Sequence, residues 1–391
     1  MSTIGCVGSP WRATVTSGGD IEPWDGTAAL RWHVAADDRW HTPANEPSTR
    51  QRLIDGTPVV ETRVRIPGGD AVQRIYATTH RGGMTVIQVT NESSLPIAVA
   101  FTRADLLSAR PPADVPIQGI DLPVGSVTFP IGHAATATWA IAHHRPAGGL
   151  LPADLPTAEQ VVHGWLSTCE RASRLTLPDQ SLVESVTAAR CAALLEPLPS
   201  PDEEPAMFLV TLAQLVRMGE PTDPWLADVA AATERVFRKG SGSWVDHAAV
   251  GAARQILSIA GEQRAIGDLD RAEARWKPSA RGDQTPAALG DISVVPMVEQ
   301  MLADRHGALL PGGLARNWAG VNFDVHGLPI DTPTGLGSVS YAIRWHGARP
   351  AVLWETTGSA ALSSPTLAPD WATAEPAGEA LWPEYVIETT S

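Results

Sequence analysis

The chain has 391 residues, 43% of them hydrophobic and 18% charged, so it can bury one large core or two to three ordinary ones. Its 43 acidic and 29 basic residues give a formal net charge of −14, which disfavours nucleic acid and anionic membranes as partners because both require a basic surface. No uninterrupted apolar stretch reaches the ~18 residues of a transmembrane helix, so we expect a cytoplasmic protein that binds no nucleic acid and no membrane.

The first 147 residues predict an antiparallel β-sandwich. Between residues 59 and 101, apolar and polar side chains alternate, and short turns such as residues 68–70 interrupt the run. Because the connections are short, we expect neighbouring strands to pair antiparallel. Strands after the first of this run are expected at residues 72–79, 84–90, 96–102, 124–130 and 135–142.

Prolines and glycines gather between residues 146 and 156 and predict a linker. Beyond the linker, apolar residues recur at helical spacing, as at Leu182, Val186 and Ala189 after Asp179. Helices are expected at about residues 158–173, 182–193, 208–216, 226–237, 245–261 and 291–304. This pattern predicts a central α-helical domain, folded as a bundle or a partial (α/α) toroid.

The last part of the chain returns to β signals. Strands are expected at residues 338–345 and 351–355, whereas residues 356–384, rich in Ala, Pro, Thr and Ser, are expected to be irregular. The predicted fold class is therefore α+β and multidomain. The predicted domains are a β-sandwich at residues 1–147, a helical domain at 148–305 and a small C-terminal β region at 306–391.

The pattern of cysteines and histidines indicates no bound metal. Cys6, Cys169 and Cys191 are widely spaced without a Cys-x-x-Cys pair, so we expect reduced thiols and neither a disulfide framework nor a zinc site. Phosphate-loop and dinucleotide-binding motifs are missing as well, and we predict no cofactor. The residues near the C-terminus with donor groups suited to a metal are His306, Asp324 and His326, but their spacing matches no metal-site signature.

The tripeptide Arg-Trp-His occurs twice, at residues 31–33 and 344–346, each time in a tryptophan-rich segment. Indole faces flanked by fixed carboxylates and guanidinium groups suit sugar rings, which present apolar C–H faces and a rim of hydroxyls. The alternative interpretation is that these tryptophans fill the cores of two β regions. The predicted sugar-binding residues are Trp24, Trp32, Trp40, Trp318, Arg344 and Trp345.

The order of predicted domains, together with the tryptophan-containing segments 318–324 and 341–355, resembles that of glycoside hydrolases and phosphorylases built on an (α/α) toroid, such as the glucoamylase-like and maltose-phosphorylase-like families. The resemblance is architectural and covers most of the chain. The chain looks like a shortened relative of these families, with room for about half of a full toroid. It implies a carbohydrate-active protein that acts on or binds an α-glucan or a related oligosaccharide. It carries over no catalytic residue, because no carboxylate motif of these families aligns with the chain.

Glycosidases use two carboxyl groups, about 5–5.5 Å apart in retaining enzymes and about 6.5–9.5 Å apart in inverting ones. The candidate catalytic residues are Glu203, Glu204, Asp246 and Glu355. The first two precede a predicted helix and the third follows a Gly/Ser-rich loop, so helix capping is the alternative role for all three. For Glu355 the alternative is an ion pair with Arg344 or Arg349.

Two classes of function therefore remain open. The first is a glycoside hydrolase-like enzyme with two carboxylates and tryptophan platforms. The second is a non-catalytic protein of the same architecture that binds a carbohydrate or a protein partner.

Overall fold

The computed structural model describes residues 1–36, 39–113, 120–144, 148–240, 242–276, 291–333 and 335–385. The chain divides into two compact units, Met1–Leu166 and Ser167–Ser391, and the division lies within helix α1 (Ala158–Cys169). Helices and antiparallel sheets are both present, so the mixed α and β content predicted from the sequence is confirmed. In the part of the chain that is described, no helix is long and apolar enough to cross a membrane.

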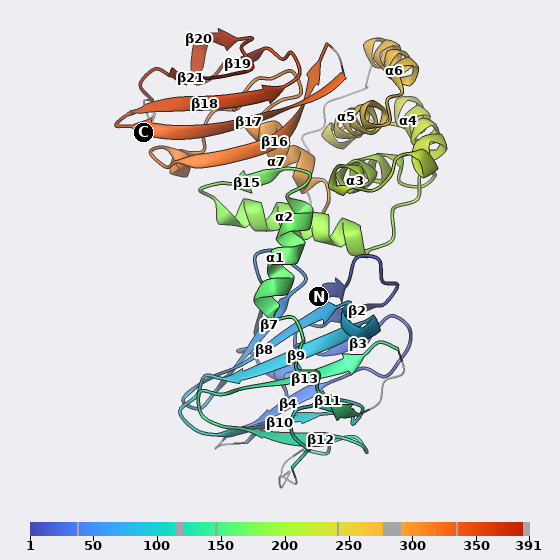
Figure 1. Ribbon diagram of the computed structural model, residues 1–391, viewed down its shortest axis with the longest axis vertical. Helices are drawn as coiled ribbons and strands as arrows, with labels where there is room; N and C mark the ends of the chain where they lie inside the picture. The colour runs from blue at the N-terminus through green and yellow to red at the C-terminus, as the bar shows by residue number, and fades with distance from the viewer. Residues whose placement is uncertain are drawn as a thin grey trace. The chain divides into compact units, whose positions relative to one another are not determined.

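The first unit is built mainly from strands, blue to green in Figure 1. One sheet contains, in order, β1 (Ser2–Gly5), β2 (Arg12–Val15) and β3 (Ile21–Pro23). A second contains β12 (Val127–Ile131), β10 (Ile97–Phe101), β4 (Trp32–Ala35) and β5 (Trp40–His41). The largest contains β14 (Gly149–Leu150), β11 (Leu107–Ser108), β13 (Thr136–Ala142), β9 (Met84–Asn91), β8 (Gly69–Thr78), β7 (Val60–Ile66) and β6 (Arg50–Leu53).

The antiparallel pairing predicted for the first run of strands is confirmed for β7, β8 and β9, which pair in chain order. It is wrong for the next strand, because β10 pairs with β4 and β12 in a different sheet. All five residues of β10 are buried, so this strand requires apolar neighbours on both faces and strand partners on both edges. One hydrophobic cluster then joins residues of all three sheets, including Ile4, Trp32 and Ile87.

A buried charge lies at the centre of three neighbouring strands in the largest sheet. The side chain of Glu61 is 0% exposed and accepts hydrogen bonds from Arg52, Arg63 and Arg74 at 3.1, 3.0 and 2.9 Å. Arg52 and Arg74 are its direct cross-strand partners in β6 and β8. Burial raises the pKa of the Glu61 carboxyl, but the hydrogen bonds and charges of the arginines outweigh it and keep this pKa below its ordinary value.

The second unit contains six helices besides the end of α1, within the described residues, and a five-stranded sheet. The helices are α2 (Gln180–Leu195), α3 (Pro205–Met218), α4 (Leu226–Lys239), α5 (Trp244–Ile259), α6 (Gln263–Arg275) and α7 (Val294–Leu302). The sheet contains β15 (Arg174–Thr176), β16 (Phe323–Thr332), β17 (Gly335–His346), β18 (Arg349–Thr357) and β21 (Ala377–Leu381). The strands β19 (Leu362–Ser364) and β20 (Ala368–Thr373) pair with each other.

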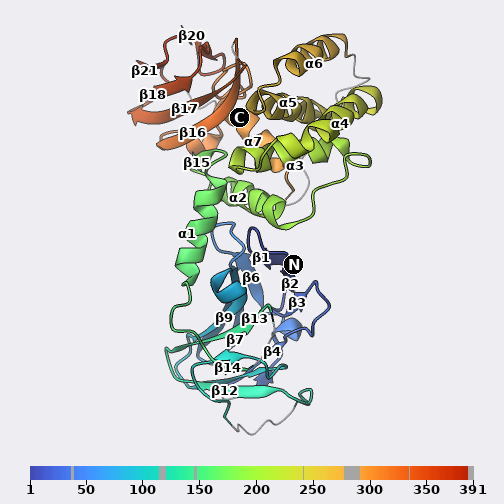
Figure 2. The same cartoon turned by 45° about the vertical axis from the view of Figure 1, so that its right-hand side comes forward.

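Short 3-10 helices occur in both units, at η1 (Pro43–Asn45), η2 (His80–Gly82), η3 (Asp223–Trp225) and η4 (Arg316–Trp318). Within the second unit, α3, α4, α5 and α6 lie together beside the sheet in both views (Figures 1 and 2). Helices and strands of this unit share one hydrophobic cluster, which includes Phe208, Val295 and Tyr341. The domain boundary predicted at residue 305 stays a prediction, and the one at residue 147 lies outside the described residues.

Two parts of the second unit differ from the sequence-based expectation. Residues 356–384 were expected to be irregular, but β19, β20 and β21 lie there, and β21 pairs with the edge of β18. Their Ala-, Ser- and Pro-rich sequences have low strand preference, so tertiary pairing decides their conformation. Helix α6 was not predicted, because most of its residues are polar or charged and its apolar stripe is narrow, with Leu269 as its one buried residue.

The role of Trp32 as a core residue can be tested by substitution. Its indole is fully buried, and the ring N–H donates to the Gly18 carbonyl at 2.7 Å. Trp32→Phe leaves that carbonyl without its donor and a gap beside it, so we expect the free energy of unfolding in urea to fall by about 1–3 kcal/mol. Trp24→Phe is the control, because Trp24 is 48% exposed and its loss should cost less than about 0.5 kcal/mol. Equal effects of the two substitutions would contradict the core role.

Candidate functional site

The tryptophans predicted to bind sugar are mostly core residues. Trp32, Trp40 and Trp318 are 0%, 7% and 2% exposed, respectively, and each belongs to a hydrophobic cluster of its unit. A ring without an exposed face offers no surface for a sugar to stack on. For these three residues the structure corrects the expectation of a platform and places them in the cores.

Trp24 and Trp345 have more exposed rings, but they belong to different units. Trp24 is 48% exposed, and its ring N–H donates to the Thr14 hydroxyl at 2.8 Å. Trp345 is partly buried at the end of β17, and its ring N–H donates to the Val321 carbonyl at 3.0 Å. These two indoles remain predicted sugar contacts.

The candidate carboxylates of the helices lie at helix starts, where one of them forms a cap. Asp246 is 8% exposed and forms a capping box with Ser243, the residue before α5, as the alternative interpretation holds. Glu204 occupies the cap position of α3 but makes no capping hydrogen bond with its side chain, and Glu203 beside it is exposed. Asp202, which precedes them, pairs with Arg235 of α4.

Glu355 lies exposed on β18, opposite Ser340 of β17. The arginines expected to pair with it have other partners: Arg344 binds Asp324 at 2.5 Å, and Arg349 donates to the Trp382 carbonyl at 3.1 Å. The four candidate carboxylates therefore come from the starts of α3 and α5 and from β18, and none of them lines either of the two cavities considered below.

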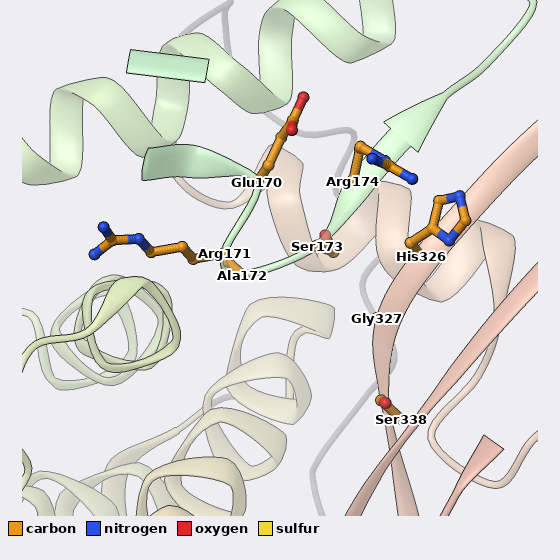
Figure 3. Close-up of a pocket in the computed structure, with 8 residues that line it drawn as sticks. All are labelled: Glu170, Arg171, Ala172, Ser173, Arg174, His326, Gly327 and Ser338. Carbon is orange, nitrogen blue, oxygen red and sulfur yellow. The ribbon is translucent and has the colours of Figure 1, made fainter. Parts of the chain in front are cut away.

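A polar cavity of about 430 Å³ lies entirely in the second unit (Figure 3). Its wall is formed by residues 170–174 and by His326, Gly327 and Ser338. The sequence predicted that α1 would continue to residue 173, but the helix ends at Cys169 and the chain turns into β15 at Arg174. The residues that leave the helix early are those that line the cavity.

A β-bulge forms the opposite wall of the cavity. The pairing of β16 with β17 shifts register between Val325 and Leu328, so that His326 and Gly327 together stand opposite the single residue Ser340. Gly327 has a φ of 73°, which favours glycine, and its N–H donates to the hydroxyl of Ser340 at 3.1 Å. Bulges of this kind re-aim side chains and are common beside binding sites.

The side chains around the cavity are chemically diverse. Arg174 and His326 are cross-strand partners in β15 and β16, so they lie on the same face and side by side in Figure 3. Arg171 points away toward the end of α3, where it donates to the Met218 carbonyl at 3.5 Å. In the described part of the chain, the side chains of Glu170, Arg174 and His326 form no hydrogen bond or ion pair. Their donors and acceptors are therefore available to a ligand.

The segment that lines the cavity is held from beneath by Arg190 of α2. The Arg190 guanidinium donates to the carbonyl oxygens of Cys169 and Ser173 at 3.3 and 2.8 Å, and to the Ser173 hydroxyl at 2.7 Å. Its side chain is 2% exposed and pairs with Glu299 of α7 at 2.9 Å. Burial lowers the pKa of Arg190 to about 10, against the opposing charge of Glu299.

A second buried arginine completes this network, which we call the Glu299 network (Arg190, Arg217, Glu299 and Ser173). Arg217 of α3 contacts both oxygens of Glu299, at 2.8 and 3.0 Å, and donates to the Ala172 carbonyl at 2.5 Å. Burial raises the pKa of Glu299, but the two arginines and the Ser173 hydroxyl outweigh it and hold this pKa below its ordinary value of 4.5. The carboxylate is therefore ionised at neutral pH.

Sequence reasoning missed the Glu299 network, although the sequence holds a signal. Arg190 lies one helical turn after Val186, on the buried face of α2, and Glu299 follows the buried Val298. A charged residue on the apolar face of a helix is rarely buried without a partner. Charged residues of opposite sign on the apolar faces of separate helices are therefore expected to pair, but the sequence does not say which of them are in contact.

A second cavity, of about 310 Å³, lies in the first unit between the strands β6 to β8 and α1. Its arginines already have an ionic partner, because Arg52 and Arg74 both bind the buried Glu61. The cavity in the second unit is the better candidate, since Glu170, Arg174 and His326 have no ion-pair partner among the described residues.

No protein-family model matches this chain, and no curated protein sequence matches it either. The site is therefore interpreted from its own geometry. His306, Asp324 and His326 are not part of a metal-type cluster, since no group of three or more His, Cys, Asp or Glu side chains suited to a metal occurs among the described residues.

Substitution of Glu299 tests the network that supports the cavity. Glu299→Gln leaves two buried guanidinium groups without a negative partner, so we expect the free energy of unfolding at pH 7 to fall by about 3–5 kcal/mol. Because the folded state lowers the pKa of Glu299, its contribution is complete above pH 4.5 and is lost as the pH falls through the folded-state pKa. Urea unfolding of both proteins between pH 7 and pH 3 measures this.

The control for this substitution is Glu234→Gln on α4. Glu234 is 72% exposed and pairs with Arg238 one turn away, so its loss should cost less than about 0.5 kcal/mol at every pH. A Glu299→Gln protein as stable as this control at pH 7 would show that the network does not hold the fold.

A matched pair of glycine substitutions tests the bulge. Gly327→Ala meets no closer atom than the Ser173 Cα at 4.0 Å, so its cost is the strained backbone, about 1–2 kcal/mol. Gly251→Ala, in the middle of α5 and facing open space, should instead stabilise the protein by about 0.5–1 kcal/mol. Chemical denaturation gives both values, and two changes of the same sign would show that the bulge does not depend on glycine.

Proposed function

We propose that this protein binds a carbohydrate, an oligosaccharide or a related sugar, in the cavity beside the bulge of β16. The observation that carries the proposal is that Glu170, Arg174 and His326, three polar side chains of different chemistry, line one cavity and have no partner among the described residues. Each hydroxyl of a sugar both donates and accepts hydrogen bonds. A carboxylate accepts, a guanidinium donates and an imidazole does either, so together they match a set of hydroxyls.

The hydroxyl of Ser338 adds a further group to this set. It exchanges a hydrogen bond with the Thr357 hydroxyl at 2.9 Å and keeps capacity for another. The cavity volume of about 430 Å³ lies within the roughly 300–1,000 Å³ of small-molecule sites. The supporting segment is fixed by the Glu299 network, so binding requires little ordering of the backbone.

Binding is favoured over hydrolysis by the composition of the cavity. Among the described residues of its wall, Glu170 is the only carboxylate, whereas most glycoside hydrolases act through a pair. A glycoside hydrolase-like activity is our second proposal, and its support is that Glu203, Glu204 and Glu355 are exposed carboxylates of the same unit.

The proposal extends to the architecture and the compartment. We infer that the first unit is a β-sandwich, which is supported by the hydrophobic cluster shared by its sheets, and that α2 to α7 correspond to a shortened (α/α) toroid. The three cysteines are free, which supports a reducing compartment such as the cytoplasm.

Thermal unfolding against a panel of sugars tests the proposal. The panel contains α-linked, β-linked and acidic oligosaccharides. A sugar at about 100 times its Kd should raise the Tm of the wild type by roughly 5–10 °C, because it binds only the folded state. Arg174→Ala should lose this shift, whereas Arg316→Ala, an exposed arginine of the same unit outside the cavity, should retain it.

Product analysis of every stabilising sugar separates the two proposals. Intact sugar after prolonged incubation supports a binding protein, and cleavage that is lost in Glu203→Gln, Glu204→Gln or Glu355→Gln supports the enzyme. If no sugar in the panel raises the Tm, or if Arg174→Ala retains the full rise in Tm, the proposed binding site is wrong.

A further inference from the structure

Two of the three cysteines lie in contact in the second unit. Cys169 is the last residue of α1, and Cys191 lies within α2. Their sulfur atoms are 3.5 Å apart, and the residues are 2% and 3% exposed. Both are free thiols, as is Cys6, which is buried in the first unit.

We propose that Cys169 and Cys191 are a redox modification site that forms an intramolecular disulfide when the protein meets a low-molecular-weight disulfide such as oxidised glutathione. A disulfide requires a sulfur separation of about 2.05 Å, so the two atoms must approach by about 1.5 Å. Cys169 lies at a helix end that is followed by a turn, where a small backbone movement and side-chain rotation can supply this approach. The sequence pattern alone gave no reason to pair these two cysteines.

The reaction consists of two thiol–disulfide exchanges. The Cys169 thiolate attacks one sulfur of the oxidant and forms a mixed disulfide, which releases one small thiol. The Cys191 thiolate then attacks the Cys169 sulfur and displaces the second small thiol. In total the two protein thiols lose two protons and two electrons, and the oxidant disulfide gains them as two thiols.

The surroundings of the two thiols support this order of events. The hydrogen bond with Cys191 and the charge of Arg190 lower the pKa of Cys169, against an opposing effect of burial. Burial raises the pKa of Cys191 instead. Cys169 borders the exposed Glu170 at the end of α1, whereas Cys191 lies within α2, so a local opening that breaks the Arg190 contact with the Cys169 carbonyl brings Cys169 to the oxidant first.

The third cysteine provides a control within the same chain. Burial raises the pKa of Cys6 to about 11, against the opposing charge of Arg12. A thiol with such a pKa is almost entirely protonated near neutral pH and reacts slowly. Cys6 should therefore keep its thiol under conditions that oxidise the pair.

The test is oxidation of the folded, full-length protein with excess oxidised glutathione, followed by alkylation and non-reducing peptide mapping. We expect a Cys169–Cys191 linked peptide, an alkylated Cys6, an intact mass lower by two hydrogen atoms, and full reversal by dithiothreitol. The cross-link closes a loop between residues 22 apart, so the Tm should rise by roughly 5–10 °C.

Variants confirm the assignment. Cys6→Ser should form the same disulfide and show the same rise in Tm. Cys169→Ser and Cys191→Ser should show neither, and each should carry at most a glutathione adduct. An unfolded sample, treated in parallel, shows when the oxidant has had time to oxidise accessible thiols. If folded wild type still has three free thiols at that time, the proposal is overturned, and a disulfide that involves Cys6 or a second chain would overturn it as well.

Discussion

One buried carboxylate connects three helices of the second unit. Glu299 of α7 pairs with guanidinium groups from α2 and α3, and those guanidinium groups also bind three backbone carbonyls between Cys169 and Ser173. A buried ion that loses its partner destabilises the fold by several kcal/mol. Moving one of the three helices away from the others would leave such an unpaired charge in the interior. The cavity wall is thus fixed by groups that lie beneath it, and the side chains on its outer surface remain free to meet a ligand.

The tryptophans of similar segments differ in whether their rings are buried or exposed. Trp32 and Trp318 come from the same kind of Trp-rich segment as Trp24, yet the first two are buried and the last is exposed. Composition and neighbouring charges are alike in these segments, and only the position on a strand or turn decides which ring face meets water. The proposed sugar binding therefore rests on hydrogen-bonding groups in the cavity and not on stacking against these buried indoles.

Local sequence signals predicted most helices and strands, but they could not predict pairings between residues that are distant in the chain. Asp179 caps α2 through the Ser181 amide, and Ser243 and Asp246 cap α5, so the starts of these helices were legible from neighbouring residues. Strand β21 pairs with the edge of β18, and β19 pairs with β20, and no local pattern in the sequence records either pairing. The cavity joins residues about 150 positions apart in the chain, such as Arg174 and His326, so its existence depends on a pairing that the sequence does not announce.

The bulge in β16 also changes the strand's buried positions from odd-numbered to even-numbered residues. Before it, the odd-numbered Phe323 and Val325 are buried, and after it, the even-numbered Leu328 and Ile330 are. A two-residue alternation read straight through this segment therefore assigns half of the strand to the wrong face. Loss of one residue between Val325 and Leu328 would restore the regular alternation and keep all four apolar side chains on one face, so the extra residue belongs to the cavity wall and is not needed for the core of the sheet.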